Sequence, residues 1–176
     1  QQLHAAGWAV TLQPLNRTTP EQLQATTHAV FIASTYGEGD APDNAALFQR
    51  QCMGQVLPLA QLRYSLLALG DSQYTQFCGF GRALDAWLQA QQAQPLHARI
   101  DVDQAHDSSA ALADWQAQLA TALQLQSSSN ALPSGPSPST WTLVERQHLN
   151  PGSQGGAVYH LELQAASAEA QATTWQ

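Results

Sequence analysis

The chain has 176 residues, a formal net charge of −7 and a sequence pI of about 5.1. It contains no lysine, and its six arginines are scattered. This argues against binding to nucleic acid or to an anionic membrane surface, because both need clustered cations. The length is enough for one domain with a core and part of another, and the 44% of hydrophobic residues lies within the ordinary globular range.

Neither the cysteines nor the histidines form a recognisable motif. Cys52 and Cys78 are far apart in the sequence, so a disulfide scaffold is not predicted and a reducing, cytoplasmic compartment is favoured. The six histidines lack the spacing of metal ligands, and we expect no metal site. No segment approaches the roughly 20 apolar residues of a membrane span. A membrane tether, if the protein has one, is therefore expected to precede this segment.

The beginning of the chain predicts the end of a helix followed by a strand. Gly7 comes after residues 1–6 as a helix C-cap. Residues 8–15 alternate between apolar and polar side chains, which predicts a strand. Thr19 is then expected to cap a short helix that has Pro20 at its first position.

Residues 29–34 and 64–69, which contain the apolar runs 29–33 and 66–69, predict strands. Such runs are typical of a sheet covered on both faces. Residues 43–53 predict a helix between these strands, and residues 81–92 predict a helix after the second one. The apolar face of this last helix is expected to contain Leu84, Trp87 and Leu88.

Residues 96–102 predict a third strand that ends among acidic residues, and Asp107 or Ser108 is expected to cap a longer helix. The apolar face of that helix comprises Leu112, Trp115, Leu119 and Leu123. Strands that alternate with helices predict βαβ units and a parallel sheet. Residues 1–126 are therefore expected to form an α/β doubly wound domain, with a ligand beyond the carboxyl ends of the strands.

The composition changes after Leu125. Residues 127–140 are rich in serine, proline and glycine, which predicts a flexible linker. Residues 141–146 and 158–163 predict strands joined by turn residues at 150–156. We therefore expect residues 141–176 to begin a second, β-rich domain. Neither end of the sequence resembles a natural terminus, so we expect an internal piece of a longer protein.

Polar loops follow the first two apolar strands, at the edge where such sheets bind ligands. Each loop contains one tyrosine, Tyr36 or Tyr74, together with glycines and acidic residues. Two aromatic rings at one sheet edge indicate a flat aromatic ligand held between them, and glycine allows backbone groups to approach it closely. A flavin ring system, which is planar and polar along one edge, has these needs. Taken singly, each loop is also compatible with an ordinary turn.

The loop at residues 34–40, followed by residues 42–45, and the loop at 69–81 resemble the FMN loops of the diflavin reductases. That family includes NADPH–cytochrome P450 reductase and the flavoprotein subunit of NADPH-sulfite reductase. The resemblance covers residues 8–125 as a flavodoxin-like domain. It continues through residues 141–163, which resemble the entry of the ferredoxin-reductase-type FAD domain, a β-barrel.

This resemblance implies that Tyr36 and Tyr74 stack on opposite faces of FMN. The first loop would contribute Ser34, Thr35, Tyr36, Gly37, Glu38 and Gly39. The second loop would contribute Leu69, Gly70, Asp71, Ser72, Gln73, Tyr74, Thr75, Gln76, Phe77 and Cys78. Asp103 falls near the family's third loop and would also contact the cofactor. No side chain is expected to act as a general acid or base, because the flavin carries the chemistry.

The sequence departs from the family pattern in two respects. Thr75 and Gln76 are neutral where the family usually has an acidic residue and often a histidine, which weakens an acidic docking face for a haem partner. The family's first strand and its phosphate loop would precede Gln1. We therefore expect the 176-residue chain, made alone, to be unstable, to bind FMN poorly and to be inactive.

The resemblance implies an electron-transfer flavoprotein. Electrons would pass from NADPH to FAD, then to FMN, and on to a haem protein or to the haemoprotein subunit of sulfite reductase. An alternative is a non-catalytic flavodoxin-like module that contacts proteins through its acidic face. A response-regulator-like domain is disfavoured, because that function needs a lysine and this chain has none.

Overall fold

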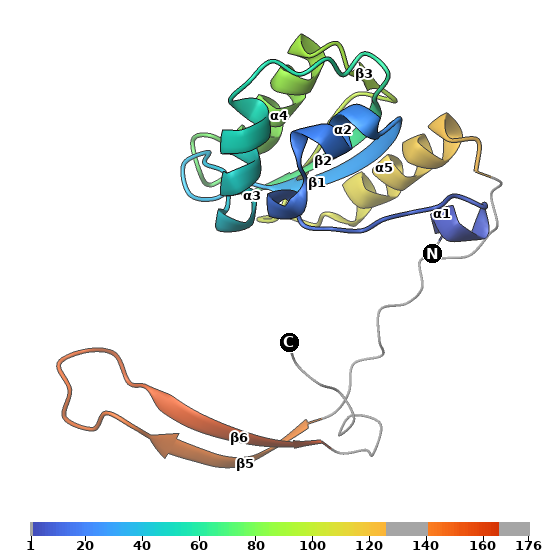
Figure 1. Ribbon diagram of the computed structural model, residues 1–176. Helices are drawn as coiled ribbons and strands as arrows, with labels where there is room; N and C mark the ends of the chain where they lie inside the picture. Colours follow the sequence, from blue (N-terminus) through green and yellow to red (C-terminus); the bar gives the residue numbers. More distant parts are fainter. Residues whose placement is uncertain (1, 126–140, 166–176) are drawn as a thin grey trace. The chain divides into compact units, whose positions relative to one another are not determined.

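The computed structural model describes residues 2–125 and 141–165. They belong to two compact units, one within residues 1–127 and one within residues 128–176 (Figure 1). The first unit contains a parallel β-sheet with helices, and the second contains a two-stranded hairpin. The predicted linker, residues 127–140, and the end of the predicted second domain, residues 166–176, lie outside the described residues.

The chain begins with a short helix that ends where the sequence predicts. Helix α1 spans Gln2–Ala5, and Gly7 follows it with a φ of +83°. The amide of Gly7 donates to the carbonyl of His4, and the amide of Trp8 donates to the carbonyl of Leu3. Glycine adopts this left-handed conformation without steric cost, so the predicted C-cap is confirmed.

The strand predicted at residues 8–15 is wrong. Residues 8–14 form no strand, and η1, a 3₁₀ turn, occupies Leu15–Arg17. A strand needs a neighbouring ladder, and none of the described strands pairs with this segment. The ring of Trp8 meets His28 edge-on at 5.1 Å between centroids, while the Leu12 side chain is 96% exposed. Alternation in the sequence indicates a suitable pattern but does not supply the partner strand.

Helix α2, Pro20–Ala25, begins with the predicted cap. The hydroxyl of Thr19 accepts from the amide of Gln22 at 3.3 Å, and the Gln22 side chain accepts from the amide of Thr19 at 3.0 Å. This reciprocal capping box satisfies two amides that the helix itself leaves unpaired. The helix ends before β1 and buries Leu23 in the core.

Strand β1 (His28–Ser34) pairs in parallel with β2 (Arg63–Gly70) along its whole length. On the other side of β2 lie two short parallel strands, β3 (Gln94–Pro95) and β4 (Ile100–Asp103). Of the third predicted strand, residues 96–102, only residues 100–102 form a strand, as part of β4, and residues 96–99 do not. The interruption at residues 96–99 contains His97 and Arg99, whose side chains form inward hydrogen bonds in place of a continuous ladder.

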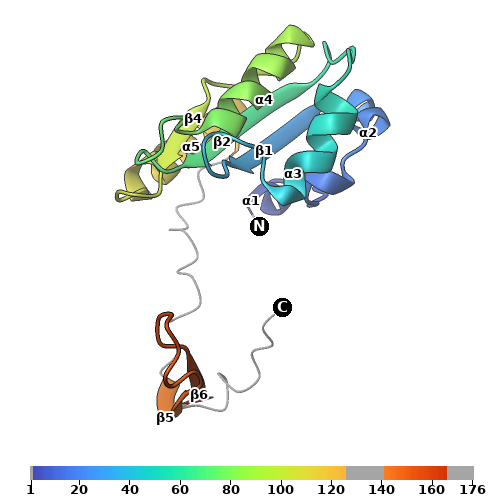
Figure 2. The same ribbon diagram turned by 90° about the vertical axis from the view of Figure 1, so that its left-hand side faces the viewer.

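Helices cover the two faces of this sheet differently (Figure 2). Helix α3 (Asp43–Phe48), which continues as a π-helical turn η2 at Gln49–Met53, packs on one face together with α4 (Gly79–Ala90). Helix α5 (Ser109–Ala122) packs on the other face through Trp115 and Leu119. The predicted helices and their apolar faces are confirmed, and α4 begins two residues earlier than predicted.

Strand β2 is buried on both faces, as predicted, but β1 is not. Phe31 and Ala33 of β1 are buried under α3 and α4, whereas Val30 is 39% exposed and Ile32 is 57% exposed. Val30 and Ile32 share the face that α5 covers over β2 and β4, and within residues 2–125 and 141–165 no element extends that cover to β1. The expectation of a fully covered first strand is therefore wrong.

One buried hydroxyl connects the central strand with α5. Ser65 Oγ, fully buried in β2, accepts from the Trp115 indole nitrogen at 2.8 Å and lies 2.9 Å from His97 Nε2. His97 Nδ1 lies 2.8 Å from the carbonyl of Ala98, which can only accept. In the neutral ring, Nδ1 therefore carries the proton and Nε2 accepts from Ser65, so this hydrogen-bonded network satisfies the indole, the hydroxyl and both ring nitrogens.

The second unit is an antiparallel hairpin of β5 (Trp141–His148) and β6 (Tyr159–Ala165). It confirms both strands predicted there. The Arg146 guanidinium lies 3.9 Å from the centre of the Tyr159 ring, and the Asn150 side chain holds the connecting loop through Gly156 and Val158. Among the described residues of both units, no helix has the length and apolarity to cross a membrane.

Candidate functional site

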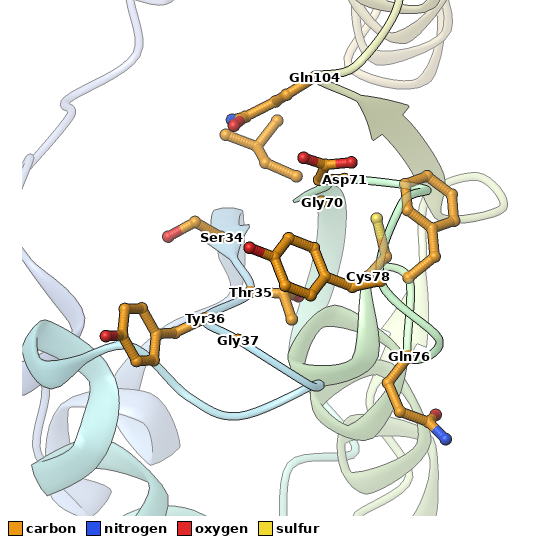
Figure 3. A pocket seen from close by; sticks show the side chains of 12 residues that line it. Ser34, Thr35, Tyr36, Gly37, Gly70, Asp71, Gln76, Cys78 and Gln104 are labelled. Carbon is orange, nitrogen blue, oxygen red and sulfur yellow. The ribbon is translucent and has the colours of Figure 1, made fainter.

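A cleft of about 250 Å³ opens at the carboxyl ends of β1 and β2 (Figure 3). This volume is close to the lower end of ligand pockets, which span about 300–1,000 Å³. The cleft lies where the sequence analysis expects it, because Ser34 ends β1 and Gly70 ends β2. In a parallel α/β sheet, this edge is the usual place for a ligand.

Eleven of the predicted site residues line the cleft: Ser34, Thr35, Tyr36, Gly37, Leu69, Gly70, Asp71, Tyr74, Gln76, Phe77 and Cys78. Six do not line it: Glu38, Gly39, Ser72, Gln73, Thr75 and Asp103. The cleft has one further lining residue, Gln104, that the sequence analysis missed. The amide of Gln104 donates to the carbonyl of Gly70 at 2.8 Å, which holds Gln104 beside the end of β2. Its position directly after the third strand, at the carboxyl edge of the sheet, is the sequence feature that could have identified it.

The first loop is a tight turn built on two glycines. The amides of Tyr36 and Asp40 each donate to the other residue's carbonyl at 2.9 Å, which closes the loop on itself. Gly37 has a φ of +48° and Gly39 a φ of +116°, backbone conformations that residues with a Cβ atom rarely adopt. The Tyr36 ring extends to one side of the cleft and is 71% exposed, so the loop presents it to solvent (Figure 3).

The second loop is held by its own hydrogen bonds. The Asp71 carboxylate accepts from the amide of Gln73 at 2.8 Å, and the Asp71 carbonyl accepts from the amide of Tyr74 at 3.1 Å. This is the Asx-turn chemistry expected of an aspartate at a loop start. It presents Tyr74 at the cleft with 47% of its surface exposed. Cys78 then adopts a left-handed conformation, with a φ of +51°, at the start of α4.

The two loops touch each other through glycines. A Cβ atom on Gly79 would lie 2.7 Å from the Cα of Gly39, and one on Gly39 would lie 2.7 Å from the Cβ of Gln76. A Cβ atom on Gly70 would meet the amide of Cys78 at the same distance of 2.7 Å. Because real side chains do not approach so closely, only glycine allows these segments to meet in this way.

Thr35 has a hydroxyl without a partner. Its Oγ1 is shielded from solvent, yet no group within the described parts of the chain forms a hydrogen bond with it. Buried hydroxyls are nearly always paired, and an unpaired one needs an explanation. Since Thr35 lines the cleft, a polar ligand there could supply the missing partner.

Asp103 lies beside the cleft, and its carboxylate is held by hydrogen bonds from three residues. Its Oδ1 accepts from the amides of Ser72 at 3.1 Å and Ala105 at 3.0 Å, and its Oδ2 lies 2.8 Å from His106 Nδ1. The hydrogen bond of the Ser72 side chain is the largest influence lowering the pKa of this carboxyl, with smaller contributions from the Ser72 amide, His106 and Ala105. The group is therefore ionised at neutral pH.

Neither thiol chemistry nor metal binding is indicated at the cleft. Burial, followed by the charge of Asp101, raises the pKa of the Cys78 thiol to about 11, so the thiol stays protonated at neutral pH. Its sulfur lies 3.5 Å from the carbonyl of Ala68. Across residues 2–125 and 141–165, no three metal-ligating side chains gather at one place.

Together these features fit a planar ligand with a polar edge. The largely exposed ring of Tyr36 and the half-exposed ring of Tyr74 offer faces for stacking. The glycines leave room for the ligand to approach the backbone closely. The unpaired Thr35 hydroxyl offers a hydrogen bond to a polar edge. The side chains at the cleft can hold and orient such a ligand, but they include no evident acid–base pair.

The fold resembles that of solved flavodoxins. A cysteine-to-serine mutant of flavodoxin from Pseudomonas aeruginosa superimposes with a TM-score of 0.59 at 24% identity, over 69% of this chain and 83% of that one. Flavodoxin 2 from Bacillus cereus gives the same TM-score of 0.59 at 21% identity, over 70% of this chain and 84% of its own. The first unit is therefore a flavodoxin-like α/β domain, as predicted.

The chain belongs to the flavodoxin family, which it matches over residues 1–115. Its relatives include the flavoprotein alpha-component of NADPH sulfite reductase from Aliivibrio fischeri, 34% identical over 90% of this chain. The alpha-component from Vibrio vulnificus is 32% identical over 94% of this chain, and that from Bacillus subtilis is 38% identical over 65% of it. The predicted resemblance to diflavin reductases is confirmed. The chain spans 29%, 30% and 19% of the length of these three relatives, respectively.

Proposed function

We propose that the first unit binds FMN in the cleft and belongs to an NADPH-dependent electron-transfer flavoprotein of the sulfite reductase type. The observation that carries this proposal is the pair of solvent-facing rings, Tyr36 and Tyr74, at one sheet edge of a flavodoxin-family chain. Exposed aromatic rings are costly in water, and a stacked flavin would remove them from it.

The roles of the cleft residues follow from their positions. Tyr36 and Tyr74 stack on the flavin ring system, Gly37 lets the backbone approach its edge, and the Thr35 hydroxyl donates or accepts a hydrogen bond. FMN, when bound, supplies the electron-transfer chemistry. The acidic side chains of the two loops, such as Glu38 and Asp71, disfavour added negative charge and so lower the flavin's reduction potential.

The other cofactors and the partner belong to the full natural polypeptide. We propose that the β5–β6 hairpin begins an FAD-binding barrel and that electrons pass from NADPH through FAD to FMN. The acceptor is a haem protein, with the haemoprotein subunit of sulfite reductase favoured by the names of the relatives. We also propose a cytoplasmic location, which the two widely separated cysteines favour.

The test is to purify the full natural polypeptide, add FMN, and identify any retained flavin by absorbance and by chromatography after release. We expect FMN to be retained. Tyr74→Ala should weaken FMN binding by about 5–150-fold, because base–aromatic stacking of comparable size contributes about 1–3 kcal/mol. Tyr159→Ala, which removes a tyrosine from the hairpin, is the matched control and should leave FMN affinity unchanged.

A colourless preparation that takes up no FMN would contradict this function. That result would favour a flavodoxin-like module that binds proteins through its acidic surface. Equal loss of FMN affinity in Tyr74→Ala and Tyr159→Ala would show that the flavin binds elsewhere than in the cleft.

A further inference from the structure

Two charged side chains bind the second loop without lining the cleft. Asp103 comes from the end of β4, and Arg82 comes from the first turn of α4. Neither contributes to the cleft wall, yet each forms hydrogen bonds with the segment that presents Tyr74. Their contacts lie on opposite sides of Tyr74 in the sequence, at Ser72 on one side and at Gln76 and Phe77 on the other.

Asp103 fixes the beginning of the loop. One of its carboxylate oxygens accepts simultaneously from the amides of Ser72 and Ala105, so it joins the second loop to the segment after β4. The other oxygen is engaged by His106. Hydrogen bonds that involve an ionised group are shorter and stronger than neutral ones. The start of the Asp71–Tyr74 turn is therefore held from outside as well as by the turn itself.

Arg82 fixes the end of the loop. Its Nη1 donates to the carbonyl of Phe77, and its Nη2 donates to the Gln76 side-chain oxygen at 2.8 Å. The planar guanidinium can reach two acceptors at once, which limits the rotation of the segment. In Figure 3 the Gln76 amide extends away from the rest of the cleft, which fits this engagement with Arg82.

The contact at Gln76 also reaches the first loop. Gly39 packs so closely on the Gln76 side chain that a Cβ atom on Gly39 would lie 2.7 Å from the Gln76 Cβ. Movement of Gln76 would therefore displace Gly39, three residues after Tyr36. Arg82 thus supports the place where the two tyrosine-bearing loops meet.

Tyr74 itself has little other support. Its ring is 47% exposed, and within the described residues its hydroxyl forms no hydrogen bond. The orientation of the ring must therefore be set through the backbone on either side of it. We infer that Asp103 and Arg82 act as a two-point clamp on the second loop that positions Tyr74 for flavin stacking. This inference rests on the proposed function. Both side chains would be positioning residues, which orient Tyr74 without contacting the cofactor themselves.

The experiment compares D103A and R82A with wild type in the full natural polypeptide, with three readouts. These are FMN affinity, the visible circular dichroism of FMN at saturation, and hydrogen exchange of the Ser72 and Tyr74 amides in the FMN-free form. Each substitution should weaken FMN binding by about tenfold, the loss expected for one or two hydrogen bonds to a charged group. Both should change the dichroism at saturation, and D103A should speed the exchange of both amides.

Matched controls separate the clamp from a general loss of stability. D107A removes an exposed aspartate that, like Asp103, accepts a backbone amide, here that of Ser109, after the same strand. R17A removes an exposed arginine with no hydrogen bond to either loop. Both should keep FMN affinity within about twofold of wild type, as surface substitutions usually do, and should leave the dichroism unchanged.

Two further variants test the contact itself. D103N keeps an acceptor oxygen for Ser72, so it should bind FMN within about threefold of wild type. S72P removes the amide that Asp103 binds, and it should reproduce the effect of D103A even if D103A folds poorly.

Wild-type affinity and dichroism in D103A and R82A would overturn the clamp while leaving the FMN proposal intact. D103N as weak as D103A would also overturn it, because the acceptor oxygen that D103N retains for Ser72 would then contribute nothing to FMN binding. If the wild-type protein takes up no FMN, the proposed function fails, and the clamp's role in stacking fails with it.

Discussion

At the scale of single residues, Gly79 determines how closely the two loops approach. A Cβ atom there would lie 2.7 Å from the Cα and 3.0 Å from the oxygen of Gly39, both backbone atoms that cannot rotate away. Gly79→Ala should therefore push the first loop outward, weaken FMN binding about tenfold and lower the free energy of unfolding by about 1–3 kcal/mol. FMN titration and urea unfolding measure these two effects.

Gly156→Ala is the control for that substitution. Gly156 lies in the hairpin loop, and nothing stands within 4 Å of the position of its Cβ. FMN affinity should not change in this variant. A Gly79→Ala protein with wild-type affinity would show that contact between the loops does not shape the cleft.

The residue types in the sequence were enough to predict most of the residues that line the cleft, but not the role of each one. Tyr36 and Tyr74 are recognisable as aromatic residues in polar loops that follow apolar strands, and both line the cleft. Asp103 was expected to contact the cofactor, whereas its carboxylate is occupied by Ser72, Ala105 and His106. Ser72 lies 31 residues from Asp103 in the sequence, so no local pattern reveals that this carboxylate holds the second loop.

At the scale of elements, Ser65 connects β2, α5 and the segment between β3 and β4. Ser65→Ala would leave the Trp115 indole nitrogen and His97 Nε2 without their shared partner. Leaving buried polar groups unpaired should lower the free energy of unfolding by about 1–3 kcal/mol, measured by urea unfolding. Ser108→Ala, at a position whose side chain makes no cap hydrogen bond, should change it by less than about 0.5 kcal/mol. Equal effects of the two substitutions would contradict this role for Ser65.

Elements with a local sequence pattern could be predicted, whereas elements that depend on distant partners could not. Helices α4 and α5 were predictable because their apolar spacing is local to each segment. The strand expected at residues 8–15 failed because pairing depends on a neighbour, and none of the described strands provides one. The third strand formed only from residue 100 onward. In the residues before it, His97 contacts the buried Ser65 and Arg99 pairs with the partly buried Asp85, contacts that alternation does not encode.

At the scale of the whole molecule, the parallel sheet brings three loop-bearing strand ends to one edge. Strands β1, β2 and β4 end at Ser34, Gly70 and Asp103, and the cleft lies beside these ends. The order of helices and strands was enough to predict this convergence, since parallel strands share one carboxyl edge. It did not predict that β1 would be covered on only one face, with Val30 and Ile32 left partly exposed.

The most direct test of the central claim is hydrogen exchange of the full natural polypeptide with and without FMN. Bound FMN should slow amide exchange in residues 34–40 and 69–78, the two loops that flank the cleft, and leave residues 141–165 unchanged. FMN that binds without protecting either loop, or that protects residues 141–165 instead, would contradict the assignment of this cleft as the flavin site.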